Sequence, residues 1–249
     1  MNSAHTIDQL WTAQPKPIRV VLIESDRANR RDNIELLDLA ERFPLVAAVI
    51  GRLDLSGDAC SDEFAELTEH PAGGRWRGAR IVLRRDIDDP WDATAASNAS
   101  MLGSAGRVLE ILAPSDRLSE SASIARQVDC SVVVDHLGLP PWHGTDEDWS
   151  EWERQFAELS RVTTVVTKLG FLPGLPGDSI WVTRVQRAAT IAFEYFGADR
   201  LMYASNWPVP ADPTGEDYPF ASVLSLIEGL SPSERDAVSG NTAREIYGV

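Results

Sequence analysis

Three polar side chains stand at or near the ends of apolar runs, and their types could carry chemistry. His136 follows a valine-rich run, Lys168 interrupts a run of valine and threonine, and Asn206 ends a third apolar stretch. A histidine can act as a general acid or base near neutral pH, and an amide or an ammonium can stabilise negative charge that develops on an oxygen. We therefore predict that His136, Asn206 and Lys168 are the catalytic residues.

Alternation of side chains along a strand decides which of these groups could meet. His136 would share a face with Val132 and Val134 and would be the last inward residue of its run. Asn206 would share a face with Met202 and would end its own run in the same way. The two side chains would then converge at one end of the sheet.

A second group of residues lies at or near strand ends and is predicted to contact the substrate: Glu24, Arg52, Asp54, Arg80 and Trp207. The four charged members could instead form an internal ion-pair network that touches no substrate. The catalytic candidates have structural alternatives as well. His136 could be a satisfied structural group, and Asn206 could hold a loop through hydrogen bonds to the backbone. Lys168, inside an apolar run, must be paired or lie near the mouth of the fold.

The histidines and cysteines argue against a metal site. His5, His70, His136 and His143 form no His-x-His or His-x-x-x-His pair, and the chain has no Cys-x-x-Cys. Catalytic zinc usually takes about three protein ligands and keeps one position open. We therefore expect no metal and no other cofactor. A serine triad is not expected either, because the chain lacks a G-x-S-x-G elbow.

Composition sets further limits on partners and location. The formal net charge of -15 argues against a nucleic-acid partner, because binding to phosphates needs clustered lysine and arginine. No apolar run approaches the roughly 18 residues that span a bilayer, and residues 1–17 lack the pattern of a signal peptide. Cys60 and Cys130 are interpreted as reduced thiols. We expect a cytoplasmic protein that acts on a small molecule.

The 249 residues suit one domain, 1–249, with an irregular segment at 1–17. Seven short apolar runs predict buried strands at 18–24, 45–55, 78–83, 107–112, 131–138, 163–170 and 201–209. Helical patterns lie between them, including 33–43, 148–161 and 179–196. Such alternation predicts a parallel α/β sheet, either doubly wound or closed into a barrel. The lack of a glycine-rich phosphate loop after the first strand disfavours a nucleotide-binding doubly wound sheet.

Several of these segments resemble one family. VVVDHLGLP, VVTKLGF, GADRLMYASNWPV and the tail LSPSERDAVSGNTAREIYGV resemble the amidohydrolase-related branch of the amidohydrolase superfamily, which includes sugar-lactone and pyrone-dicarboxylate lactonases. GRWRGARIVL and AAVIGRLDL are also similar to strand segments of that branch. The resemblance runs from about residue 18 to residue 249. It implies an eight-stranded (β/α) barrel, or TIM barrel, whose members hydrolyse lactones or related carbonyl compounds, some of them without a divalent metal.

Two positions depart from the family pattern. The family opens with a strand that carries a His-x-His pair, but the first strand here resembles the family's second, so seven of the eight strands are accounted for. The family's last strand typically ends Ser-Asp-Trp-Pro, with the aspartate activating water, and this chain has Asn206 at that position. An amide is not a useful base near neutral pH. His136 does match the family's histidine after its strand.

Three functional hypotheses follow. The first is a metal-independent enzyme for a small carboxylate, lactone or polyketide-like carbonyl compound, acting by lactone opening or closing, cyclisation, isomerisation or decarboxylation. The second is a non-catalytic binding protein or partner subunit, in which a second copy, another chain or residues 1–17 cover the gap left by the missing strand. The third is a metal-independent lactonase in which Glu24 or Asp54 replaces the lost base.

Overall fold

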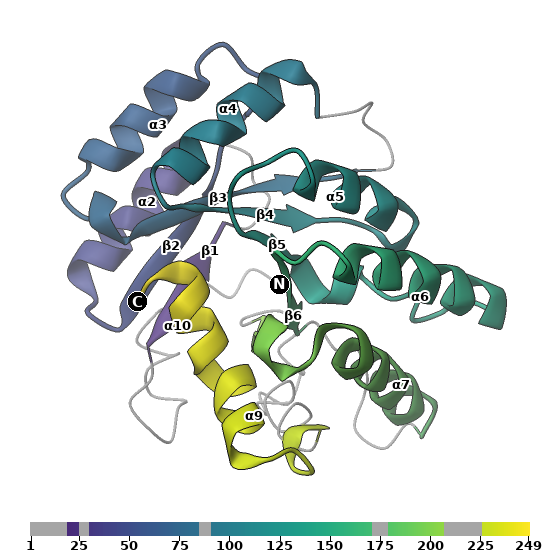
Figure 1. The fold of residues 1–249 in the computed structure, drawn as a ribbon. Helices are drawn as coiled ribbons and strands as arrows, with labels where there is room; N and C mark the ends of the chain where they lie inside the picture. Colours follow the sequence, from purple (N-terminus) through teal and green to yellow (C-terminus); the bar gives the residue numbers. More distant parts are fainter. Residues whose placement is uncertain (1–18, 25–29, 85–90, 171–178, 207–225) are drawn as a thin grey trace, which may run out of the picture.

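The structure, a computed structural model, describes residues 19–24, 30–84, 91–170, 179–206 and 226–249. Its centre is one sheet of seven parallel strands that pair in sequence order. The strands are β1 (Val20–Ile23), β2 (Val46–Arg52), β3 (Trp76–Val82), β4 (Val108–Leu112), β5 (Val132–Val134), β6 (Val165–Leu169) and β7 (Leu201–Tyr203). Figure 1 shows the sheet curling around a central space.

Helices follow the strands and cover the outer side of the curled sheet (Figure 1). They are α2 (Arg30–Arg42), α3 (Cys60–Glu69), α4 (Ala93–Ser104), α5 (Leu118–Ala125), α6 (Asp146–Ser160) and α7 (Ser179–Phe196). The C-terminal segment adds α9 (Pro232–Asp236), the π-helical turn η5 (Ala237–Asn241) and α10 (Thr242–Tyr247). Short 3-10 turns are η1 (Gly73–Arg75), η2 (Ser115–Arg117), η3 (Asp135–Gly138) and η4 (Ala198–Arg200). The predicted α/β barrel with seven recognisable strands is confirmed.

The strands are apolar on both faces because each face packs against its own layer. The outer layer lies between the sheet and the helices and includes Trp76, Leu109 and Val134. The inner layer lies within the curl and consists of Ala48, Ile50, Val108, Val133, Val166, Met202 and Tyr247. Strands covered on both sides need nearly continuous apolar residues, which explains the pattern of the sequence.

Strand β5 ends earlier than the sequence pattern predicts. Val133 belongs to the inner layer, whereas Val132 and Val134 belong to the outer one. The prediction that His136 continues an inward face with Val132 and Val134 was therefore wrong. The chain leaves the strand after Val134, and His136 adopts a left-handed backbone conformation with φ 54° and ψ 42°. The direction of its side chain is thus set by a turn and not by strand alternation.

Helix α6 illustrates how the sequence specifies the outer layer. The Thr145 hydroxyl accepts a hydrogen bond from the Asp148 backbone N–H at 3.3 Å, and the Asp148 carboxylate accepts one from the Thr145 N–H at 2.7 Å. This capping box satisfies two donors that a helix start would otherwise leave unpaired. The predicted amphipathic face is confirmed, since its apolar members are all buried: Trp149, Trp152, Phe156 and Leu159.

The C-terminal helix closes the inner side of the sheet. Tyr247 is buried in the inner layer, and Ala243, Ile246 and Val249 pack against the same layer. The Gly248 carbonyl accepts a hydrogen bond of 3.2 Å from Arg77, at the start of β3. Because Arg77 stands near the start of β3, and Val108 and Val166 of the inner layer stand near the starts of β4 and β6, α10 lies toward the end of the curl opposite the carboxyl ends.

The missing strand of the barrel concerns the two ends of the strand order, β1 and β7. Within the described residues, β1 pairs with β2 alone and β7 pairs with β6 alone. The predicted cover by residues 1–17 falls on residues outside the described part of the chain. None of the described helices combines the length and the apolar character needed to cross a bilayer.

Candidate functional site

Buried charged side chains lie on the inside of the sheet, near the carboxyl ends of the strands. They comprise three carboxylates and two cations, contributed by or directly after five different strands: Glu24, Arg80, Glu110, Asp135 and Lys168. We call these five residues the charged layer. Such groups are stable in a protein interior only when they are paired and hydrogen-bonded.

Arg80 of β3 connects the ends of β1 and β5. Its Nε donates to Glu24 Oε1 at 2.7 Å, and a terminal nitrogen also donates to the Glu24 carbonyl. The other terminal nitrogen donates to Asp135 Oδ2 at 3.2 Å. One guanidinium fork therefore holds together two residues that lie more than a hundred positions apart in the chain.

Lys168 of β6 lies between two carboxylates. Its Nζ is 2.6 Å from Glu110 Oε2 and 2.7 Å from Asp135 Oδ1. The lysine is 3% exposed and Glu110 is 0% exposed, so water contributes little to either charge. Of the two possibilities for a lysine in an apolar run, pairing is the one that the structure contains.

Tyr247 of α10 contacts the charged layer from the side of the inner apolar layer. Its hydroxyl donates to Glu110 Oε1 at 2.5 Å, so both oxygens of Glu110 are engaged, one by Tyr247 and one by Lys168. The C-terminal helix α10 thus contributes a polar contact as well as apolar packing.

The pKa directions follow from burial and pairing. Burial raises the pKa of Glu110, against the opposing effects of Lys168 and the Tyr247 hydroxyl. Burial would also raise the pKa of Asp135, but Lys168, His136 and Arg80 outweigh it and hold that pKa below its usual range. Burial would lower the pKa of Arg80, yet Asp135 and Glu24 raise it. Asp135 and Arg80 are therefore charged at neutral pH.

His136 lies directly beyond Asp135 in a turn that two helices hold in place. His136 and Leu137 both have positive φ, at 54° and 55°. The Leu137 carbonyl accepts a hydrogen bond of 3.0 Å from the Trp152 indole of α6. A Cβ on Gly138 would lie 2.2 Å from a methyl of Leu118 in α5, so only glycine fits there. The backbone that carries the imidazole is thus anchored to both helices.

The His136 imidazole is neutral at neutral pH. Burial lowers its pKa from 6.5 to about 4, because Asp135, which favours the charged form, is opposed by Lys168 and Arg80. A neutral imidazole can accept a proton or bind an electrophile without first losing a proton.

Asn206 lies just beyond the end of β7. The strand ends at Tyr203, and Met202 faces the inner layer as predicted. A Cβ on Gly170 would lie 2.6 Å from the Ala204 carbonyl oxygen, so glycine is needed where the ends of β6 and β7 approach each other. Asn206 is half-buried with φ 55°, a conformation that asparagine tolerates better than most residues.

The remaining predicted site residues divide into four groups. Glu24 and Arg80 form the predicted internal ion pair. Arg52 is half-buried at the end of β2, opposite Arg80 in the ladder, and its backbone is held by the Asn33 side chain. Asp54 is exposed in the turn before α3. Trp207 lies outside the described residues.

Sequence reasoning missed two members of this arrangement and underused a third. Glu110 is a lone carboxylate in the run RVLEIL, which is a signal that a charge is buried. Asp135 directly precedes His136 in the sequence but was not among the predicted site residues. Tyr247 gave no signal, because a tyrosine near a C-terminus has no pattern that predicts contact with a strand.

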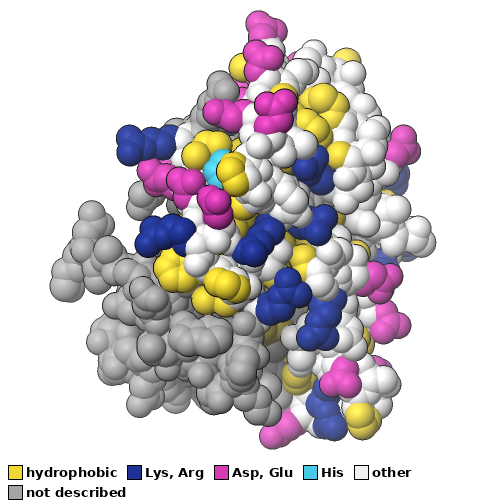
Figure 2. Space-filling view, turned by 90° about the vertical axis from the view of Figure 1, so that its left-hand side faces the viewer, with side chains coloured by type: hydrophobic (Ala, Val, Ile, Leu, Met, Phe, Trp, Pro, Cys, Tyr) yellow, Lys and Arg dark blue, Asp and Glu magenta, His cyan; other side chains and the backbone are white. Residues whose placement is uncertain are grey.

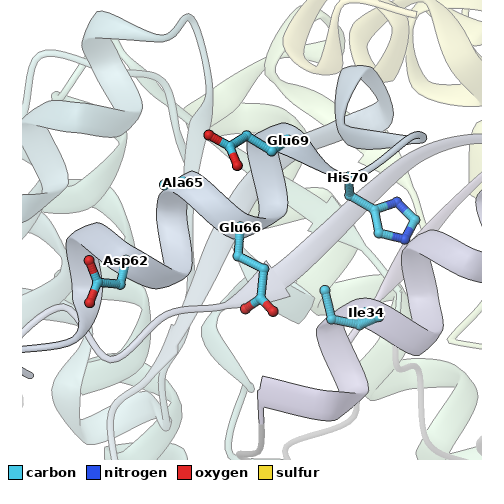
Figure 3. A pocket seen from close by; sticks show the side chains of 6 residues that line it. All are labelled: Ile34, Asp62, Ala65, Glu66, Glu69 and His70. Carbon is cyan, nitrogen blue, oxygen red and sulfur yellow. The ribbon is translucent and has the colours of Figure 1, made fainter.

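A hollow on the outside of the molecule lies away from the charged layer. It opens between α2 and α3 (Figure 3) and is lined by Ile34, Asp62, Ala65, Glu66, Glu69 and His70. Figure 2 shows side chains of both charges on this side of the molecule. His70 Nε2 lies 3.3 Å from Asp38 Oδ1, a contact between the two helices. Because ligands of α/β barrels bind at the carboxyl ends of the strands, the hollow is not the candidate active site.

The family follows from a comparison with known proteins. The family model described as amidohydrolase matches residues 10–249. The chain belongs to the amidohydrolase family. Two curated relatives of this amidohydrolase are L-fucono-1,5-lactonases. The one from Burkholderia multivorans is 28% identical over 248 residues, covering 90% of this chain and 78% of the relative. The one from Burkholderia ambifaria is 27% identical, covering 93% and 80%.

Solved structures share the fold of this amidohydrolase. A crystal structure of an amidohydrolase from Burkholderia multivorans with bound zinc has a TM-score of 0.82 at 28% identity, over 93% of this chain and 83% of that one. A probable 2-pyrone-4,6-dicarboxylic acid hydrolase from Acinetobacter baumannii, with citric acid bound, has a TM-score of 0.75 at 18% identity, over 93% and 84%. The second likeness concerns the fold alone.

The bound zinc of that relative raises the question whether this amidohydrolase has suitable ligands. Among the described residues, no three histidine, cysteine, aspartate or glutamate side chains are grouped to hold a metal ion. The buried carboxylates near the strand ends already contact cations of the protein, with Lys168 on Glu110 and Asp135 and with Arg80 on Glu24 and Asp135. The described donor set therefore does not fit a metal.

Replacement of Lys168 tests the charged layer. Lys168→Met keeps the length of the side chain but leaves Glu110 and Asp135 buried without their shared cation, so we expect the free energy of unfolding to fall by about 3–5 kcal/mol at neutral pH. Denaturant unfolding measures this loss. The matched control Arg154→Met breaks a fully exposed pair with Glu151 and should leave stability unchanged. A Lys168→Met protein as stable as the wild type would contradict the stabilising role of the buried ion pairs in the charged layer.

Replacement of His136 tests its lowered pKa. The His136 imidazole has a pKa of about 4 in the folded state and about 6.5 in the unfolded state. The free energy of unfolding should therefore fall by about 3 kcal/mol as the pH is lowered through this window. His136→Asn, which tolerates the same backbone conformation, should lack that loss. Unfolding at a series of pH values measures the difference, with exposed His143→Asn as the control. A difference that does not vary with pH would contradict the assignment.

Proposed function

We propose that this amidohydrolase hydrolyses a small lactone, such as the cyclic ester of a sugar acid, without a resident metal ion. The observation that carries the proposal is His136, a neutral imidazole anchored beyond a strand end in a chain that is similar along most of its length to lactonases. The family resemblance alone would also fit other carbonyl chemistry. The extended similarity to two L-fucono-1,5-lactonases favours lactone opening.

His136 is proposed as the general base and then the general acid. A water molecule attacks the carbonyl carbon of the lactone while His136 removes its proton, and a carbon–oxygen bond forms. When the ring ester bond breaks, His136 returns that proton to the leaving ring oxygen. The product is a hydroxy acid, and no oxidant or further reactant is needed. A pKa of about 4 makes the imidazole a weak base, but one that is in the accepting form at neutral pH.

Asn206 is proposed as a donor to the carbonyl oxygen. Its amide cannot remove a proton from water, but its N–H groups can stabilise the negative charge that forms on that oxygen. The position of Asn206 beyond the end of β7, two residues after Ala204, which lies against Gly170 at the end of β6, supports a place at the mouth. This division of roles explains how hydrolysis can proceed although the family's aspartate is replaced.

Lys168 and Asp135 are proposed to hold His136 in position without contacting the substrate. Sequence reasoning assigned Lys168 a direct role on the substrate oxygen, but its ammonium already contacts two carboxylates at 2.6 and 2.7 Å. We therefore propose that Lys168 fixes Asp135, the residue that precedes His136. Glu24 is paired with Arg80 and Asp54 is exposed outside the charged layer, so neither is well suited to replace the base.

The substrate contacts proposed here are Arg52 and Trp207. Arg52 is half-buried at the end of β2, on the strand next to Arg80, where it could bind a hydroxyl or carboxylate of the substrate. Trp207 follows Asn206 directly in the chain. Glu24 and Arg80 are proposed to set the electrostatic potential around Asp135 without contacting the substrate.

A panel of aldono-1,5-lactones and of pyrone-dicarboxylate lactones tests the proposal. We expect the wild-type protein to hydrolyse at least one of them, with the same rate before and after treatment with a chelator. His136→Ala should lower kcat/KM for that lactone by about 10²–10⁴-fold. His143→Ala is the matched control. Failure to hydrolyse any lactone, with or without added zinc, would overturn the function, and loss of activity on chelation would overturn the metal-independent part.

Asn206→Asp separates the two roles that this position can have. If Asn206 donates to the carbonyl oxygen, a carboxylate of the same shape repels the developing charge and kcat/KM should fall by about 10²-fold. Asn241→Asp, at an exposed residue of η5, is the control for the added charge. A gain of activity in Asn206→Asp would mean that the site lacks only its base, and would contradict the donor role.

A further inference from the structure

The buried hydroxyl of Tyr247 is the feature from which this inference begins. Tyr247 is 2% exposed, and its ring lies in the inner apolar layer. Its hydroxyl is 2.5 Å from Glu110 Oε1. The ring would pack equally well without an oxygen, so the hydroxyl has a role that apolar packing does not explain.

A continuous series of contacts runs from this hydroxyl to the proposed base. Glu110 accepts from Tyr247 with one oxygen and from Lys168 with the other. Lys168 also contacts Asp135, and Asp135 directly precedes His136. Each contact lies in the interior of the sheet, where charge interactions are screened least.

The sharing of Lys168 makes the hydroxyl important. The ammonium that contacts Glu110 at 2.6 Å also contacts Asp135 at 2.7 Å, so Glu110 shares this cation with a second carboxylate. Burial favours the neutral form of Glu110, and Lys168 and the Tyr247 hydroxyl favour its charged form. Loss of the hydroxyl would leave the buried charge of Glu110 with one interaction fewer.

We propose that Tyr247 is a positioning residue for the hydrolysis proposed above, on which this inference rests: its hydroxyl keeps Glu110 ionised, so that Lys168 remains between Glu110 and Asp135 beneath His136. The C-terminal helix α10 then takes part in the function of a site at the opposite end of the strands. Tyr247 acts through Glu110 and contacts no substrate.

Tyr247→Phe tests the role of the hydroxyl while it preserves the ring. The charged and titratable groups that act on Glu110 come from four elements, and they are Arg80, Asp135, Lys168 and Tyr247. Without the hydroxyl Glu110 accepts a proton more readily, so the acid limb of kcat/KM should move to higher pH by about one unit. Tyr195→Phe, on α7, is the matched control and should keep the wild-type profile. An unchanged acid limb in Tyr247→Phe would overturn the proposal.

A double variant tests whether Tyr247 acts through Glu110. In Glu110→Gln the carboxylate that the hydroxyl holds is absent, so adding Tyr247→Phe should not change the pH profile of Glu110→Gln any further. Additive effects of the two substitutions would overturn the stated route.

Thermal unfolding provides a readout that needs no activity. Because burial raises the pKa of Glu110 in the folded state, holding it in the charged form lowers the free energy of unfolding more at neutral pH than at low pH, and loss of the hydroxyl should therefore cost most at neutral pH. We expect Tyr247→Phe to lower Tm by about 5 °C at neutral pH, and this gap should narrow as the pH falls and Glu110 becomes protonated. A gap that is constant with pH would overturn the coupling. If the wild-type protein hydrolysed no lactone, the proposed function would fail, yet this gap would still decide whether Tyr247 controls Glu110.

Discussion

The ion pairs of Lys168 with Glu110 and Asp135 are the interaction on which the rest of the structure depends. Together with Arg80 they join residues from five of the seven strands inside the curl. Removing one partner of a buried pair typically costs about 3–5 kcal/mol, a large share of the roughly 5–15 kcal/mol that stabilises a folded domain. The strands therefore cannot shift independently near their carboxyl ends without separating buried charges.

This layer divides the interior into two parts with different tasks. Below it, apolar side chains and the C-terminal helix fill the curl, so that end contributes stability. His136 and Asn206 follow the ends of β5 and β7 by two and three residues, and both have positive φ. The cations of the layer contact its carboxylates, with Lys168 on Glu110 and Asp135 and Arg80 on Glu24 and Asp135. Chemistry by a neutral imidazole and an amide is consistent with that arrangement, and it accounts for an amidohydrolase with Asn206 in place of the usual aspartate.

The strands and the helices that cover them could be predicted from the sequence because they depend on local periodicity, whereas the barrel came from the family resemblance. Short runs of valine, isoleucine and leucine that alternate with amphipathic helices specify a parallel sheet covered on both faces. The charged layer could be predicted only in part. An ion-pair network among four charged residues near strand ends was one of two alternatives, and the structure contains the pair of Glu24 and Arg80. The contact of Tyr247 with Glu110 joins positions 137 residues apart and leaves no local pattern. The face of His136 was predicted wrongly because the alternation rule holds only while the strand continues, and β5 ends at Val134.

A crystal structure with the hydroxy-acid product of a hydrolysed lactone would test the central claim most directly. The account predicts that the product carboxylate lies within about 3.5 Å of the His136 imidazole and the Asn206 amide, while Lys168 remains between Glu110 and Asp135. A product bound in the hollow between α2 and α3, or a Lys168 ammonium that leaves its carboxylates to contact the product, would contradict it.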